Sequence, residues 1–281
     1  LNAKDREQIR LYFLDADGNK MGEYRLNITW LPIVTIVAPE GIVDEPKRPC
    51  HIEIIDPKGR TEDGLHYFRS YAGIEYRGSG AQLYPKKPYS ITLRDEATEE
   101  SIDAKLLGLR NDNKWILDAM WLDLANMRNR VCFDIWNEFN VLHYAGQEPK
   151  AMSGTHGYLV ELFLDGEYYG LHTLSDRLDR KQLKIKKSGG YLYKTRDWTD
   201  EVMLRGIGSV YDNNSENWAG LSSDYPDEGD GGIEFKYYHD LVDFVANSSD
   251  AVFDANFETY LDMGNTVDYF IYINLVMAYD N

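Results

Sequence analysis

Apolar and polar residues alternate along much of the first hundred residues, and this pattern predicts β-structure. Two strand-like runs flank a turn-rich cluster at residues 15–20, which is typical of a hairpin. A second hairpin is predicted at residues 158–174, because Asp165-Gly166 separates two alternating apolar runs. The further strands predicted from β-branched or alternating residues are 30–38, 50–55, 72–77, 89–93 and 190–194.

Helical periodicity first emerges near the middle of the chain. Apolar residues recur at a spacing of four at Met127, Val131, Ile135 and Phe139. This spacing predicts a helix over residues 124–139, with Asp123 as its N-cap. Arg128 falls on the same apolar face, so we expect it to have an anionic or carbonyl partner or to reach the edge of that face.

The last seventy residues are predicted to hold one long loop and two helices. Residues 211–232 are rich in Asp, Asn, Ser and Gly, which indicates a long loop or insertion. Helices are expected over residues 235–246 and 257–277, the second of them largely buried. Since the sequence stops at Asn281, directly after this apolar segment, we expect the domain to be interrupted there.

Composition excludes several classes of partner. The chain has 281 residues, with 30 Lys and Arg against 47 Asp and Glu, which gives a formal net charge of −17. This charge repels phosphate backbones and anionic membrane surfaces, so we expect no nucleic-acid partner. The longest apolar stretch, residues 269–279, contains Asn274 and falls short of the roughly 20 residues of a membrane span.

Most of the common chemical motifs are missing. The sequence contains no Walker phosphate loop, no HExxH and no GxSxG, and its six histidines lack metal-ligand spacing. Asp15 and Asp17 resemble the start of a calcium loop, but Lys20 and Leu26 stand where such a loop needs Gly and Glu, which favours the hairpin. The two cysteines, at positions 50 and 132, fit neither a CxxC pair nor a zinc site; unpaired thiols are favoured over one disulfide.

One arrangement of residues does point to chemistry. The small-residue turn Gly78-Ser79-Gly80 is followed by Lys86-Lys87, which lead into a strand. Glycine lets backbone N–H groups approach a phosphate, and a strand-borne lysine reaches phosphate oxygens. An acidic helix, a hairpin and a helical region come next, which is the element order of a protein kinase. The alternative is a structural turn with solvated lysines.

These residues belong to a longer resemblance. The chain is similar to the CotH kinase-like family, which comprises spore coat protein H and its bacterial surface relatives. The similar segments run in family order from about residue 30 to residue 281 and are 76–95, 106–117, 127–129, 160–171, 176–180 and 268–270. Residues 1–29 lie outside the resemblance and form a hairpin extension or the end of a preceding domain.

The resemblance implies an α+β, atypical protein-kinase-like bilobal fold. Residues 30–187 would form the β-rich N-terminal lobe, and residues 188–281 the first part of a helical C-terminal lobe that is incomplete. It also implies ATP as phosphoryl donor, Mg²⁺ or Mn²⁺ as metal, and Ser/Thr acceptors on a protein substrate. The protein would be bacterial and extracellular, periplasmic or attached to the cell surface.

The resemblance also assigns nucleotide-binding roles in the first half of the chain. The segment Arg77, Gly78, Ser79 and Gly80 matches the turn that would cover the phosphates, and Lys86 with Lys87 matches the family's paired lysine. Strand alternation groups Lys87 with Tyr89, Ile91 and Leu93, so we favour Lys87 as the inward lysine.

Further roles fall on residues later in the chain. Arg128 and Glu138 would bridge the lysine, the phosphates or a carboxylate, or else form a buried ion pair with no catalytic role. Asp176 stands where the family usually has Glu. Asp280 matches the base that would accept the proton of the substrate hydroxyl. The metal-binding aspartate is expected beyond Asn281.

Two functions remain in competition at this stage. The first is a kinase for a secreted or surface protein, and the negative charge of the chain favours a basic, Ser-rich acceptor. The second is an inactive module of the same fold that acts in adhesion, scaffold assembly or glycan and protein binding, as the many Tyr and Trp residues would suit. A β-rich glycan-binding module is disfavoured by the helical second half.

Overall fold

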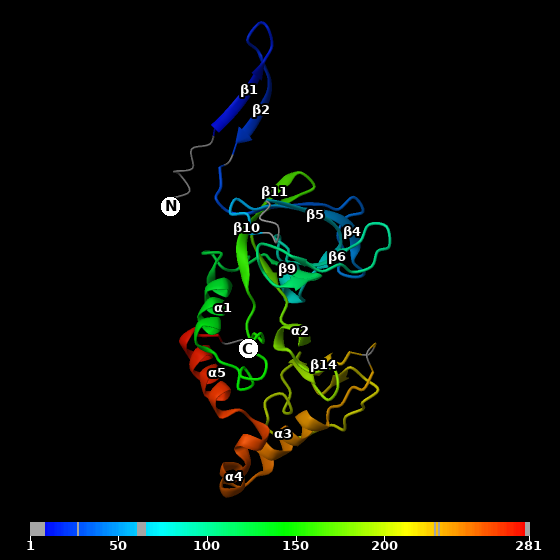
Figure 1. The fold of residues 1–281 in the computed structure, drawn as a ribbon, viewed down its shortest axis with the longest axis vertical. Helices are drawn as coiled ribbons and strands as arrows, with labels where there is room; N and C mark the ends of the chain where they lie inside the picture. The colour runs from blue at the N-terminus through cyan, green and yellow to red at the C-terminus, as the bar shows by residue number, and fades with distance from the viewer. Residues whose placement is uncertain (1–8, 27, 61–65, 228, 230, 279–281) are drawn as a thin grey trace. The chain divides into compact units, whose positions relative to one another are not determined.

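The computed structural model describes residues 9–26, 28–60, 66–227, 229 and 231–278. Both strands and helices are present, as predicted, and their order is shown in Figure 1. The chain divides into two compact units, Leu1–Asn113 with Leu159–Thr173 and Lys114–Tyr158 with Leu174–Asn281. The domain limits predicted from the sequence, after residues 29 and 187, stay a prediction.

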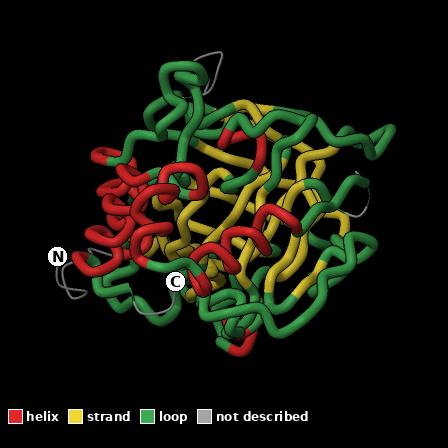
Figure 2. The backbone as a smooth tube through the Cα atoms, turned by 90° about the horizontal axis from the view of Figure 1, so that it is seen from below, coloured by secondary structure: helices red, strands yellow, loops and turns green. Residues whose placement is uncertain are grey.

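A closed seven-stranded barrel is the largest sheet, and its strands are among those drawn in yellow in Figure 2. The strand order is β10-β11-β9-β6-β5-β4-β3. The strands are β3 (Ile33–Val37), β4 (Arg48–Ile55), β5 (Tyr67–Tyr76), β6 (Tyr89–Arg94), β9 (Lys114–Asp118), β10 (Gly157–Leu164) and β11 (Glu167–Asp176). Strands β3 to β6 pair antiparallel in chain order, whereas β3 and β10 pair in parallel.

The barrel core follows from the alternation in the sequence. Successive side chains of a strand point to opposite faces, so every second residue enters the core. Fully buried residues of this kind are Val34, Ile36, Ile52, Ile54, Ile74, Ile91 and Leu93. The sequence therefore predicts these strands correctly, but it does not predict β9, whose run of three buried apolar residues does not alternate.

Both predicted hairpins are confirmed. Strands β1 (Ile9–Leu14) and β2 (Lys20–Leu26) pair antiparallel, and the Asp15 carboxylate accepts N–H groups of the connecting turn. The turn between β10 and β11 has positive φ at both Asp165 (50°) and Gly166 (86°). Such a turn matches the right-handed twist of the strands that it joins.

The remaining elements of the first unit are short. A 3₁₀ helix, η1 (Gly80–Leu83), follows the predicted glycine turn. Strands β7 (Ala104–Lys105) and β8 (Asn111–Asp112) form a small antiparallel pair.

Helix α1 (Arg128–Phe139) begins four residues later than predicted. The Asp123 carboxylate accepts the N–H groups of Ala125, Met127 and Arg128 at 2.9, 2.8 and 2.7 Å, and Asn126 has a left-handed φ of 51°. Asp123 therefore closes a turn that precedes the helix, and the N-cap position falls on Met127 instead.

The predicted apolar face of α1 is also wrong. The four residues that defined it, Met127, Val131, Ile135 and Phe139, are all more than a third exposed. The buried residues of the helix are Arg130 and Trp136. The Trp136 ring lies 5.1 Å from that of Tyr272, which packs helix α5 against α1.

The segment predicted as a long loop contains two strands. Strands β13 (Asn217–Trp218) and β14 (Leu221–Tyr225) form a three-stranded sheet with β12 (Leu192–Thr195) in the order β12-β14-β13. The physical reason is a small apolar cluster in which Trp218 and Leu221 of this polar segment pack with Ile233 and Phe235, which follow it. A four-residue helix, α2 (Arg180–Leu183), follows the barrel strands.

The C-terminal region holds three helices where the sequence predicts two. Helix α3 (Lys236–Asn247) is confirmed, and the second predicted helix is divided into α4 (Asp250–Tyr260) and α5 (Met263–Leu275). The break arises because Leu261 and Asp262 are extended and the Asp262 carboxylate accepts the Asn265 N–H at 2.6 Å, which caps a new helix.

The apolar character of α5 does not reflect burial. None of its residues is buried, and Phe270 and Leu275 are each 66% exposed. The prediction of a largely buried helix is therefore wrong for this segment. Within the described residues, no helix combines the length and the hydropathy that crossing a membrane requires.

Candidate functional site

The predicted phosphate turn lies between β5 and β6 of the first unit. Gly78 has a left-handed φ of 80°, and a Cβ added to it would lie 3.3 Å from that of Ala81. Arg77 donates its backbone N–H to the Pro88 carbonyl at 3.0 Å, which holds the entry of the turn against its exit. All four residues from Arg77 to Gly80 are exposed. The turn therefore presents its backbone to solvent in a conformation that favours glycine.

The two predicted lysines have different partners. The Lys86 ammonium group donates to the Leu171 carbonyl, and the Lys87 ammonium group donates to the Gln82 carbonyl. Both side chains are partly buried. As strand alternation predicts, Tyr89, Ile91 and Leu93 are fully buried in β6.

Gln82 connects Lys87 to the glycine turn. Its side-chain amide donates to the Gly78 carbonyl and, at 2.6 Å, to the Asp44 carboxylate. The backbone carbonyl of Gln82 accepts a hydrogen bond from the Lys87 ammonium group. We call Gly78, Gln82 and Lys87 the turn–lysine cluster. It brings two of the sequence-predicted features together through Gln82, which is not among the predicted site residues.

An aromatic layer fixes the start of β6 beside this cluster. The Tyr169 hydroxyl donates to the Pro85 carbonyl at 3.1 Å, and its ring lies 6.2 Å from that of Tyr89. The His172 ring stacks on both tyrosines, and its Nε2 lies 3.3 Å from the Lys87 carbonyl oxygen. Burial, with the hydrogen bond to Tyr169, raises the pKa of Tyr89, so the Tyr89 hydroxyl stays protonated near pH 7.

Arg128 and Glu138 lie on the exposed surface of α1. The Arg128 side chain is 73% exposed, and its Nε lies 3.6 Å from an Asp123 carboxylate oxygen. Glu138 is also exposed. The anionic partner expected for Arg128 is thus Asp123. Neither Arg128 nor Glu138 is part of a buried ion pair.

The buried arginine of α1 is Arg130, which is not among the predicted site residues. Its side chain is 7% exposed and donates to the Thr155 carbonyl and, at 2.9 Å, to the Asp134 carboxylate. Asn137 also donates to the Thr155 carbonyl, at 3.0 Å. Arg130 and Trp136 are the two buried residues of α1, so only knowledge of the surfaces that the helix meets would have distinguished Arg130 from Arg128.

Asp176 is buried at the end of β11. Its Oδ1 accepts the backbone N–H of His156 at 2.8 Å, and its Oδ2 lies 4.0 Å from the His156 Nδ1. Burial and the positive charge of Arg130 lower the pKa of His156. Asp176 therefore holds the segment before β10 in place, in an environment where His156 is neutral near pH 7.

Two predicted parts of the site fall outside these observations. Asp280, the predicted base, lies outside the described residues. Among the residues that the structure does describe, no group of three or more His, Cys, Asp or Glu side chains could hold a metal ion.

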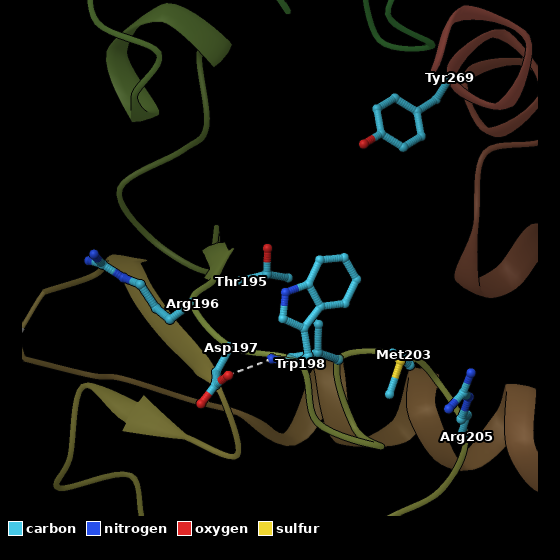
Figure 3. A pocket seen from close by; sticks show the side chains of 8 residues that line it. Thr195, Arg196, Asp197, Trp198, Met203, Arg205 and Tyr269 are labelled. Carbon is cyan, nitrogen blue, oxygen red and sulfur yellow. Dashed lines mark hydrogen bonds between the residues drawn. The ribbon is translucent and has the colours of Figure 1, made fainter. Parts of the chain in front are cut away.

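A further pocket of about 590 Å³ lies in the second unit and is drawn in Figure 3. The Trp198 indole, which is 63% exposed, and the Tyr269 ring both border it. The Asp197 carboxylate accepts the backbone N–H of Trp198 at 2.8 Å and so fixes the turn that presents the indole. Neither Trp198 nor Tyr269 is among the predicted site residues, and the signal in the sequence for this pocket is a Trp within a polar segment.

Comparison with known protein families identifies the class to which this fold belongs. Residues 74–281 match the model of a family described as CotH kinase protein. The match includes the turn–lysine cluster, α1 and Asp176. The chain therefore belongs to the CotH kinase family, as the resemblance implied. A search of curated proteins found no match.

Proposed function

We propose that this chain is a CotH-like atypical protein kinase that transfers the γ-phosphate of ATP to Ser or Thr side chains of a secreted or surface protein. Membership of the CotH kinase family supports nucleotide-related chemistry. The single observation that carries the proposal is the turn–lysine cluster, in which Gln82 connects Lys87 to the Gly78 turn. Residues 30–187 and 188–281 would form the two lobes.

The turn–lysine cluster fits a phosphate group. The Lys87 ammonium group contacts a neutral carbonyl, so a phosphate oxygen would bring it a stronger, charge-assisted bond. The exposed turn from Gly78 to Gly80 has no side chain at two of its three positions, which lets a phosphate approach the backbone. Lys86, held by the Leu171 carbonyl, would orient the start of the strand.

The remaining roles come from the family resemblance. Asp280 would accept the proton of the attacking hydroxyl, and Mg²⁺ or Mn²⁺ would neutralise charge on the phosphates. We assign no step to the metal, because the described residues contain no cluster that fits one. The net charge of −17 would steer a basic, Ser-rich acceptor toward the protein.

ATP binding by the full native protein tests the cluster. We expect Lys87→Met to weaken binding about tenfold, since a charge-assisted bond to phosphate is lost. Lys58→Met is the matched control, because Lys58 is an exposed lysine in another turn of the first unit. Thermal melting of both variants would verify the fold. Equal ATP affinity of Lys87→Met and the unmutated protein would overturn the assignment.

A second candidate function is an inactive module of the same fold that binds glycans or proteins at the cell surface. The pocket bordered by Trp198 and Tyr269 favours it, since exposed aromatic faces suit such contacts. This function predicts that Trp198→Ala abolishes binding to its surface ligand while Lys87→Met leaves that binding unchanged. The opposite result would exclude it.

A further inference from the structure

A basic pocket of about 670 Å³ lies within the second unit, and we propose that it binds a phosphate monoester, such as a phosphoserine or phosphothreonine side chain of a protein. The site is distinct in composition from the turn–lysine cluster. It goes beyond the kinase proposal, because phosphate binding here does not require that this chain transfer phosphate.

The charge of the pocket is opposite to that of the chain. In the whole sequence, 47 acidic residues exceed 30 basic ones. In the lining of the pocket, six cationic side chains exceed four carboxylates. The cationic residues are Lys114, Arg177, Arg180, Lys181, Lys187 and Arg196. Cations gathered in an otherwise strongly negative protein indicate an anionic ligand.

Two of the arginines have only neutral partners among the described residues. Arg180 donates to the Ile185 carbonyl at 2.9 Å, and its guanidinium lies 5.0 Å above the Tyr225 ring. Arg196 donates through its Nε to the Ser222 hydroxyl at 2.9 Å. Each contact holds the guanidinium in place without neutralising it. Both groups therefore keep charge and N–H donors for a ligand.

Two of the four carboxylates that line the pocket, Asp224 and Asp179, are engaged by other groups. Asp224 lies 3.4 Å from the guanidinium of Arg177, and Asp179 accepts the backbone N–H of Gln182 at 2.9 Å. The first contact is long and partly exposed, so a dianion would compete for Arg177. Arg177 thus adds a third guanidinium within reach of the same cavity.

The lining favours a phosphate group over a whole nucleotide. Tyr225 is the one aromatic residue among the described lining residues, and the Arg180 guanidinium covers its ring. One face of this ring is therefore already occupied by a cation. The buried residues Ser222 and Ser223 of β14 also line the pocket, but their hydroxyls already donate to the backbone carbonyls of Lys194 at 3.4 Å and Pro226 at 2.6 Å. The donors available to a phosphate are therefore the guanidinium groups, whose forked geometry suits phosphate oxygens.

Binding of a phosphoserine peptide with neutral flanking residues tests the proposal, by calorimetry on the full native protein. We expect measurable binding of this peptide and none of its unphosphorylated form. Arg180→Gln and Arg196→Gln should each weaken binding about tenfold, since each removes charge-assisted bonds to phosphate. The control Arg69→Gln removes a surface arginine of the first unit and should change affinity less than about twofold.

Competition distinguishes the source of the phosphate. Inorganic phosphate and ATP should displace the peptide more weakly than an excess of the phosphopeptide does. If ATP bound more tightly than the phosphopeptide, and if Arg196→Gln abolished this ATP binding, the pocket would be a nucleotide site and the proposal would be wrong. Equal binding of the phosphorylated and unphosphorylated peptides would also overturn it. A protein that binds the phosphopeptide but transfers no phosphate would contradict the kinase proposal alone.

Discussion

Neutralising the buried carboxylate of Asp56 should destabilise the first unit in a pH-dependent way. Asp56 follows β4, is fully buried, and accepts the backbone N–H groups of Lys58 and Arg60 at 3.1 and 2.8 Å. The Arg60 guanidinium adds two bonds, of 2.9 and 2.8 Å. Because every one of these groups is a donor, the ionised carboxylate is the form that the fold stabilises.

The pKa gives the size of the effect. Burial alone would raise the pKa of Asp56, but the bonds from Arg60 and Lys58 outweigh it and lower the pKa from 3.8 to about 2. One unit corresponds to about 1.4 kcal/mol, so ionised Asp56 contributes roughly 2 kcal/mol at pH 7. A lowered pKa means that this contribution is complete well above pH 4 and is lost as the pH falls through about 2.

Urea unfolding of Asp56→Asn, followed by circular dichroism, tests this reasoning. The variant should lose roughly 2 kcal/mol of unfolding free energy at pH 7 but only about 1 kcal/mol at pH 3. Asp95→Asn is the control, because Asp95 is exposed although its carboxylate also accepts N–H groups. It should have the smaller effect at both pH values. A loss that is the same at pH 7 and pH 3 would refute the argument.

Three further predictions concern the two thiols, the arginines of α1 and the close packing of Gly157 against a neighbouring backbone. Burial raises the pKa of the Cys50 thiol to about 12, whereas Cys132 is partly exposed and lines a cavity beside α1. A thiol reagent at pH 8 should therefore modify Cys132 alone in the folded protein. Modification of both thiols would contradict this prediction. Arg130→Met should lower the unfolding free energy by about 2 kcal/mol, and Arg128→Met by less than about 0.5 kcal/mol, because only the first breaks buried bonds. Gly157→Ala would place a Cβ 2.6 Å from a backbone carbonyl oxygen and should cost more than about 2 kcal/mol in a melting experiment; an unchanged melting temperature would contradict the packing described.

The sequence predicts the barrel strands well because their burial alternates. Ile52 and Ile54 enter the core while Glu53 between them does not, and this periodicity is visible in a single sequence. Strand β9 escapes the same method because Trp115, Ile116 and Leu117 are buried in succession. A short apolar run of this kind does not distinguish a strand from a helix.

The helices illustrate what a periodic pattern leaves undetermined. The spacing of four predicts that α1 is a helix, but which residues are buried is set by the surfaces that the helix meets, and these residues are Arg130 and Trp136. In the same way, the apolar residues of α5 predict a helix correctly and burial wrongly. Its break from α4 could have been found, since Asp262 stands three residues before the N–H that it caps.

The candidate site was predicted in part. The glycine turn and the lysines follow from local sequence and resemblance, and the structure brings Gly78 and Lys87 into one cluster. Gln82, which connects them, carries no signal in the sequence because its role depends on the 3₁₀ turn. The basic pocket is likewise invisible, since its cationic residues come from three stretches of the sequence, at residues 114, 177–187 and 196, that only the fold assembles.

Phosphate transfer from γ-labelled ATP is the most direct test of the central claim. The full native protein would be incubated with Mg²⁺ or Mn²⁺ and a basic, Ser-rich acceptor. We predict labelled acceptor with the unmutated protein and with Lys58→Met, a clear loss with Lys87→Met, and a loss of at least about 100-fold with Asp280→Ala. Equal labelling by Asp280→Ala and the unmutated protein would contradict the assignment of the base. The absence of labelling by the unmutated protein would contradict the kinase function itself.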